Sequence, residues 1–268
     1  MTSCQPSEQE LVLTSVTARV SGVLGELQLT RSQTRNAINQ EMGEEILHAG
    51  RWLDGERRLK AVVLHGAGSV FCAGLDLALL RHGVSAQLRV TVDLTNQIVV
   101  RMGAMKAIVV GAVHGACLGT AGLMMAAACD LRYAARDTRF VLPEVAFGIP
   151  GMHTGLRFLA RALGPSGALA PALLQTPLTA QSLYDAAFLN GICAPEQTLA
   201  TARAVAAELA GKPASLLQKM KQHLAADRDE LIRASERYHQ QFIEQARSVF
   251  NDPESTRLRN LHLRHGSS

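Results

Sequence analysis

Glu144 is the residue whose surroundings first suggest chemistry, because it is the only charged residue between Phe140 and Leu156. A carboxylate removed from water in an apolar segment has a raised pKa, which suits a group that exchanges protons near neutral pH. The same pattern is equally typical of an acid beside a helix start. The run alone leaves both interpretations open.

Two glycine-rich turns offer chemistry of a second kind. Each follows a predicted buried strand and leads into a predicted helix, over Gly66–Leu77 and His114–Leu123. Backbone N–H groups at a helix start lack partners and form a pocket for an anion or oxyanion. Small residues there are also typical of tight helix–sheet packing, and each turn alone favours that explanation. Two similar turns in one chain favour a paired site.

The composition indicates a globular protein. Of 268 residues, 47% are hydrophobic and 19% charged, which suits one α/β domain with a helical appendage or two small domains. The net charge of +4 fits either a basic tail or attraction of an anionic ligand. The five cysteines form no CxxC pair and predict reduced core residues of a cytoplasmic protein, without a disulfide frame or metal site. Neither a signal peptide nor a membrane span is predicted.

The elements that must position the two turns alternate between strands and helices. Apolar β-branched runs predict the strands, and apolar residues at helical spacing predict the helices. This order indicates an α/β fold whose ligand site lies where strand ends meet helix starts. The predicted strands cover residues 11–20, 23–30, 60–64, 107–113 and 130–134, and the predicted helices cover 36–56, 86–103 and 121–128.

After Leu178 the strand signals disappear, and a helical C-terminal subdomain is predicted. We therefore divide the chain into a core over residues 11–194, a helical subdomain over 195–250 and a basic tail over 251–268. Residues 252–268, rich in Arg and His, are expected to be poorly ordered. The helical periodicity covers residues 179–188, 197–211, 214–225 and 228–248.

Five segments follow one another in a distinctive order: Arg35–Ile38, Phe71–Leu77, His114–Gly119, Cys129–Arg132 and Pro143–Glu144. Together they resemble the enoyl-CoA hydratase/isomerase (crotonase) family. Each segment alone is modest, but the order is highly specific, and the resemblance extends from about residue 11 to residue 210.

The resemblance implies an α/β spiral of ββα units, with C-terminal helices that complete a homotrimer or a hexamer made of two trimers. It also implies a thioester substrate on CoA or an acyl-carrier protein, bound in a bent conformation. Coenzyme A would enter as part of the substrate, so no permanently bound cofactor is expected. Nucleic acid and membranes are not expected partners, because the basic residues lack interleaved aromatics and no span is present.

The resemblance also implies roles for individual residues. The thioester oxygen would lie between the N–H of Leu75 and that of Thr120 or Ala121. We prefer Ala121, because the extra residue before Cys129 is easier to insert in the turn than in the helix. Glu144 would be the acid/base. The residues expected to border the CoA arm are Arg35, Ala37, Ala73, Asp76 and Leu77, although Asp76 is at least as well explained as a helix cap.

One departure from the family pattern bears on the reaction. Hydratases of this family use two glutamates, and the first of these positions falls here on Met124, or on Leu123 in the other alignment. Neither side chain holds or activates water. With Glu144 alone, the simplest chemistry is a proton shuttle from C2 to C4, which converts a 3-enoyl thioester into the 2-trans-enoyl thioester.

Several alternatives stay open. His153 is either a second acid/base in the same pocket or a solvent-facing residue at a helix start, whereas His114 is expected to be structural. Rival reactions are hydration with a different water site, and decarboxylation or dehydration of a carrier-protein thioester. From another class, the chain would be an inactive CoA-binding protein, although such a site gives no reason to keep an acid in an apolar run.

Overall fold

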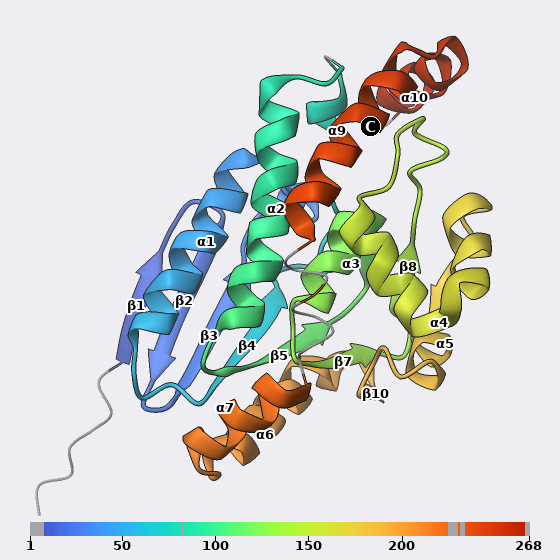
Figure 1. Ribbon diagram of the computed structural model, residues 1–268. Helices are drawn as coiled ribbons and strands as arrows, with labels where there is room; N and C mark the ends of the chain where they lie inside the picture. The colour runs from blue at the N-terminus through green and yellow to red at the C-terminus, as the bar shows by residue number, and fades with distance from the viewer. Residues whose placement is uncertain (1–7, 82, 225–229, 231–233, 266–268) are drawn as a thin grey trace, which may run out of the picture.

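A seven-stranded sheet forms the centre of the computed structural model, which describes residues 8–81, 83–224, 230 and 234–265 (Figure 1). Its strands lie in the order β1-β2-β3-β4-β5-β7-β10; the β1-β2-β3 pairs are antiparallel and the later pairs parallel. They cover Glu8–Val12 (β1), Val16–Ser21 (β2), Leu24–Leu29 (β3), Ala61–Gly66 (β4), Ile108–Val113 (β5), Leu131–Ala135 (β7) and Gly191–Cys193 (β10). A second sheet joins Ala116–Leu118 (β6), Arg139–Val141 (β8) and Leu178–Thr179 (β9).

Helices cover both faces of the main sheet. Every residue of β4 and β5 is buried, because α1 and α2 pack on one face and α6 packs on the other. The helices are Gln40–Gly55 (α1), Ala86–Ala104 (α2), Gly119–Ala127 (α3), His153–Leu173 (α4), Ala180–Asp185 (α5), Thr198–Ala210 (α6), Ala214–Leu224 (α7), Ser235–Asn251 (α9) and Pro253–His265 (α10). Short 3-10 helices cover Ser32–Thr34 (η1), Leu77–Leu80 (η2) and Pro195–Gln197 (η3).

The structure confirms the predicted α/β class but corrects two boundaries near the N-terminus. The single strand predicted over residues 11–20 is wrong: it breaks into β1 and β2, because the Glu45 carboxylate accepts the N–H groups of Thr14 and Ser15 at 3.0 and 2.7 Å. The helix predicted from residue 36 begins at Gln40. Asn39 caps it, and Asn36 has a left-handed backbone with φ of 55°.

The prediction of no strands from Leu178 onward is also wrong, because β9 begins at Leu178 and β10 follows later. They have 2 and 3 residues, too few to produce a periodic pattern, and they form only by pairing with β8 and β7. Of the helix predicted over 228–248, residues 228–229 and 231–233 lie outside the described residues. The division of the chain after residue 194 stays a prediction.

The expectation that residues 252–268 are poorly ordered is wrong for 253–265, which form α10. Arg259 anchors this helix. Its guanidinium donates to the carbonyl oxygens of Gly148 and Phe250 at 2.8 and 3.0 Å and lies 4.0 Å from the centre of the Phe250 ring. Residues 253–265 are thus held in place by hydrogen bonds to backbone carbonyls outside the segment, which the sequence of the segment does not predict.

Cys72, Cys117 and Cys129 are buried and reduced, as predicted, and Cys193 is a half-buried free thiol; Cys4 lies outside the described residues. Among the helices that the structure describes, none is long and apolar enough to cross a membrane.

An ion pair between β3 and α6 makes the stability of this fold depend on pH. Glu26 receives two hydrogen bonds from Arg203, at 2.6 and 2.9 Å, and lies 3.6 Å from the Nε2 atom of His65. The polar contact with His65, followed by the hydrogen bonds from Arg203, lowers the pKa of Glu26 from 4.5 to about 2, although burial acts in the opposite direction. A lowered pKa stabilises the fold above pH 4.5, and this contribution is lost as the pH falls towards 2.

We expect Glu26→Gln to lower the free energy of unfolding by roughly 1 kcal/mol at pH 7, since the pair is partly exposed. The difference from the unmodified protein should narrow between about pH 4.5 and 2, as measured by urea unfolding at each pH. A difference that stays constant over this range would contradict the assignment to Glu26.

Candidate active site

The two glycine-rich turns lie against each other. Cys72 pairs with Cys117 in a parallel bridge, and the Leu118 N–H donates to the Cys72 carbonyl at 2.9 Å. Gly74 has a φ of +81°, and a Cβ atom there would lie 2.4 Å from the carbonyl oxygen of Leu118. The packing explanation for small residues therefore applies at Gly74, and the same close approach brings the two turns together.

A cavity of about 790 Å³ opens where these turns meet the segment around Glu144. Its wall includes nine of the residues selected from the sequence. They are Arg35, Ala37, Ala73, Leu75, Asp76, Leu77, Thr120, Ala121 and Glu144. The remaining wall is largely apolar and includes Leu80, Phe147, Ile149, Met152 and Phe242.

Glu144 is a buried carboxylate, 8% exposed, on the turn between β8 and α4. Its Oε1 atom accepts a hydrogen bond from the Thr120 N–H at the start of α3. Its Oε2 atom is buried, and no described residue hydrogen-bonds to it. Burial raises the pKa of Glu144 above 4.5, although hydrogen bonds from Thr120 act in the opposite direction. The carboxylate is thus held at one oxygen and free at the other.

Leu75 and Ala121 bring backbone donors to the same cavity. The bridge between Ile38 and Leu75 uses the Gly74 carbonyl and the Asp76 N–H, at 2.7 and 2.9 Å, so the Leu75 N–H takes no part in it. Ala121 lies in the first turn of α3, where N–H groups have no partner within the helix. Two amide donors and one carboxylate therefore line one space.

Asp76 has the capping role weighed from the sequence. Its Oδ1 atom accepts the Ala78 N–H at 3.0 Å at the start of η2. Its Oδ2 atom lies 3.2 Å from the guanidinium of Arg31, which also donates to the Ala37 carbonyl. Sequence reasoning missed Arg31. It connects Ala37 with Asp76, two residues that line the cavity, and Asp76 lies 45 residues from Arg31 in the chain.

The structure does not place His153 in the wall of this cavity. His153 begins α4, as expected, but its ring stacks on Tyr238 of α9 at 5.8 Å, and burial lowers its pKa. His114 has the structural role predicted, since its Nε2 atom lies 3.0 Å from the Gly68 carbonyl oxygen. Leu123 and Met124 are buried and do not line the cavity.

Two further residues were missed. Asn36 is buried, and its amide donates to the carbonyls of Ala67 and Val70 at 3.0 and 2.7 Å, which fixes the first turn. His262 of α10 lines the cavity and packs edge-on against Phe147 at 4.9 Å. The place of Asn36 inside the segment Arg35–Ile38 was a usable signal in the sequence, whereas nothing in the tail pointed to His262.

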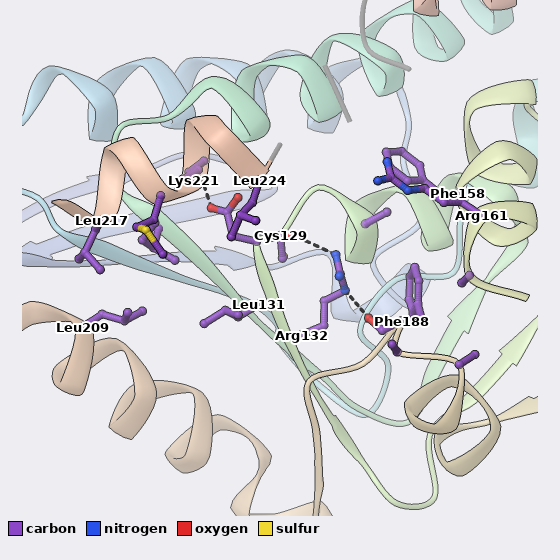
Figure 2. A pocket seen from close by; sticks show the side chains of 17 residues that line it. Cys129, Leu131, Arg132, Phe158, Arg161, Phe188, Leu209, Leu217, Lys221 and Leu224 are labelled. Atoms are coloured by element: carbon purple, nitrogen blue, oxygen red, sulfur yellow. Dashed lines mark hydrogen bonds and ion pairs between the residues drawn. The ribbon is translucent and has the colours of Figure 1, made fainter. Parts of the chain in front are cut away.

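A second cavity, of about 520 Å³, lies between α4, α6 and α7 (Figure 2). Three of its charged residues make contacts that hold the surrounding elements together. Lys221 pairs with Asp130 at 2.7 Å, and Arg132 donates to the Cys129 and Phe188 carbonyls. The segment Cys129–Arg132 therefore contributes packing rather than catalytic groups. Among the described residues, no cluster of His, Cys, Asp or Glu is arranged to hold a metal ion.

Comparison with known proteins gives one consistent result. The family model described as enoyl-CoA hydratase/isomerase matches residues 19–256. A Mycobacterium bovis protein named "Probable enoyl-CoA hydratase echA6" is 34% identical over 201 residues, covering 75% of this chain and 78% of that protein. The human mitochondrial Delta(3,5)-Delta(2,4)-dienoyl-CoA isomerase is 29% identical, covering 79% of this chain and 68% of that protein.

Solved structures agree in fold. An enoyl-CoA hydratase/isomerase from Xanthobacter autotrophicus Py2 superposes with a TM-score of 0.83 at 23% identity, covering 95% of each chain. An enoyl-CoA hydratase from Bacillus halodurans gives a TM-score of 0.82 at 20% identity, covering 92% of this chain and all of that one.

The close approach of the two turns can be tested at Gly74. We expect Gly74→Ala to lower the free energy of unfolding by roughly 1–3 kcal/mol, because a side chain there is both strained and in contact with Leu118. Gly55→Ala is the matched control: beyond its chain neighbours and its own helix backbone, no atom of the described residues lies within 4 Å of the added Cβ, so stability should stay level or rise by up to about 1 kcal/mol. Equal effects of the two substitutions in chemical denaturation would refute this packing.

Proposed function

The chain belongs to the enoyl-CoA hydratase/isomerase family, and from this premise we propose that it isomerises 3-enoyl-CoA to 2-trans-enoyl-CoA with Glu144 as its only acid/base. Glu144 takes the proton from C2, the electrons move to the thioester oxygen, and the double bond shifts as the same proton is returned to C4. No water is added and no other reactant is consumed.

One observation supports this reaction over the rest. Among the described residues that line the cavity, Glu144 is the only one whose carboxylate has an oxygen without a hydrogen-bond or ion-pair partner. Asp76, the other acid there, caps η2 and pairs with Arg31. The residues at the first-glutamate position, Leu123 and Met124, are buried outside the wall. A single carboxylate suffices to carry a proton, whereas hydration in this family ordinarily uses two.

The proposed enolate needs donors for its oxygen, and we assign the N–H groups of Leu75 and Ala121. The Thr120 N–H already donates to Glu144, which supports Ala121 as the second donor. In comparable oxyanion holes, each donor is worth about 2.7–4 kcal/mol of transition-state stabilisation. Arg35, Ala37, Ala73 and Leu77 form the rim, where we place the CoA arm.

Hydration is the second candidate, because curated relatives carry that name, including the crotonyl-CoA hydratase of Syntrophomonas wolfei at 29% identity. In that case a group other than Met124 must position the water. A carrier-protein thioester in place of CoA, and a cytoplasmic location, also stay predictions.

We further propose that the chain assembles as a homotrimer or hexamer. Leu216, Met220 and Leu224 lie on one face of α7 at a spacing of one helical turn, and they are 56%, 56% and 79% exposed. Met220 also borders the second cavity, as does Leu224 (Figure 2). Light scattering coupled to gel filtration tests the assembly, and a monomer at micromolar concentration would reject it.

The reaction is tested by incubating the protein separately with a 3-enoyl-CoA and with crotonyl-CoA, following mass and absorbance. We expect a conjugated 2-enoyl thioester from the first and no change in the second. Hydration of crotonyl-CoA would replace the isomerase with the second candidate. Inactivity on both substrates would reject both and favour a carrier-protein thioester or an inactive binding protein.

Glu144→Gln should remove the acid/base while keeping the shape of the side chain. We expect proton exchange at C2 to fall by at least about 10²–10⁴-fold, with binding of a CoA thioester nearly unchanged. Glu196→Gln, at an exposed position outside the cavity wall, is the control and should retain both properties. If binding and exchange are lost together, Glu144 has a structural role instead.

The pH dependence follows from the burial of Glu144. A base must be ionised to act, and burial raises the pKa of this carboxyl above 4.5. The rate of C2 proton exchange in the free enzyme should therefore rise with pH through a pKa above 4.5 and then level off. A profile already flat from pH 4.5 upwards would show that a group other than Glu144 limits the rate.

A further inference from the structure

Thr120 contacts the segment that carries Glu144 at several points. It is 2% exposed, and its N–H donates to the Oε1 atom of Glu144. Its hydroxyl oxygen accepts the Met152 N–H at 2.9 Å, at the far end of the same segment. One residue thus holds both ends of the turn between β8 and α4.

Two glycines, one in this segment and one in the first turn of α4, lie against Thr120. A Cβ atom on Gly155 would lie 2.6 Å from the Thr120 carbonyl oxygen and 2.8 Å from its Cβ. A Cβ atom on Gly151 would lie 3.1 Å from the Thr120 methyl carbon. Gly155 thus allows the close approach of the Thr120 backbone and Cβ, and Gly151 leaves room for the Thr120 methyl group.

We propose that Thr120 is the positioning residue for Glu144: it holds Oε1 through its N–H, fixes the supporting turn through its hydroxyl, and leaves Oε2 as the oxygen that meets the substrate. The inference rests on the proposed function, because it assigns the proton to Oε2 of the same carboxylate. Thr120 itself touches no reacting atom in this account.

The hydroxyl is the part of this arrangement that mutation can remove. Without it, the N–H of Met152 is left unsatisfied, because Met152 is itself 2% exposed. The turn then gains freedom to move, and a displacement of about 1 Å in a reacting group can cost roughly 10²-fold in rate. Serine restores the hydroxyl and should restore the position.

The test compares Thr120→Val with Thr120→Ser, and uses Thr198→Val as the matched control. Thr198 is equally buried, and its hydroxyl donates to backbone carbonyls at the start of α6, outside the cavity wall. Two readouts are taken: kcat and KM for 3-enoyl-CoA, and the pKa of Glu144 in the free protein from ¹³C NMR of labelled glutamate, assigned with Glu144→Gln. The other titratable groups of the cavity are Arg35, Asp76 and His262.

We expect Thr120→Val to lower kcat roughly 10²-fold with little change in KM. It should also raise the pKa of Glu144, because valine keeps the backbone N–H but lacks the hydroxyl, and the hydrogen bond of the Thr120 side chain lowers that pKa. Thr120→Ser and Thr198→Val should resemble the unmodified protein in both readouts. A valine variant that is only less stable, with kcat and pKa unchanged, would overturn the proposal. If valine prevents folding, Thr120→Ala removes the hydroxyl without added bulk and is judged by the same criteria.

The NMR readout separates this proposal from the proposed function. If the unmodified protein does not isomerise 3-enoyl-CoA, the isomerase assignment fails, while a pKa of Glu144 that moves in Thr120→Val still supports the positioning role. A pKa that stays fixed overturns the positioning role, whatever the reaction is.

Discussion

The burial of one carboxylate against the start of α3 is the interaction on which the site depends. An isolated carboxylate in an apolar wall would stay protonated, because ionisation there is costly. The Thr120 N–H and the partial positive charge at the helix start favour the ionised form of Glu144. The opposing effects of burial and hydrogen bonding allow this group to exchange a proton while it remains shielded from water.

The rest of the fold holds this contact in place. Parallel strands β4 and β5 deliver both glycine-rich turns to one edge of the sheet, and the bridge between Cys72 and Cys117 sets their separation. Arg31 connects Ala37 with Asp76, which both line the cavity. Arg259 hydrogen-bonds α10 to the turn that follows Glu144. Figure 1 shows α10 near the tip of the loop between β8 and α4. His262 of α10 lines the cavity.

Local patterns were enough to predict the α/β class, the two glycine-rich turns and Glu144, and the family resemblance then supplied the other residues that line the cavity. Glu144 stands out as a lone charge, and Leu75 and Ala121 follow buried strands, so their positions depend on neighbours in the chain. Contacts between distant segments could not be predicted in this way. The ring of His153 stacks on Tyr238 from another helix, and His262 reaches the cavity only because α10 is anchored by a carbonyl that lies 111 residues away from Arg259.

The most direct test of a single buried acid/base is the fate of the proton that it removes. A 3-enoyl-CoA carrying deuterium at C2 would be converted in ordinary water, and the product examined by NMR for deuterium at C4. If Glu144 alone carries the proton within a shielded cavity, part of the deuterium should appear at C4, and Glu144→Gln should abolish the transfer. A product with no deuterium at C4, or undiminished transfer in Glu144→Gln, would contradict the single-glutamate shuttle.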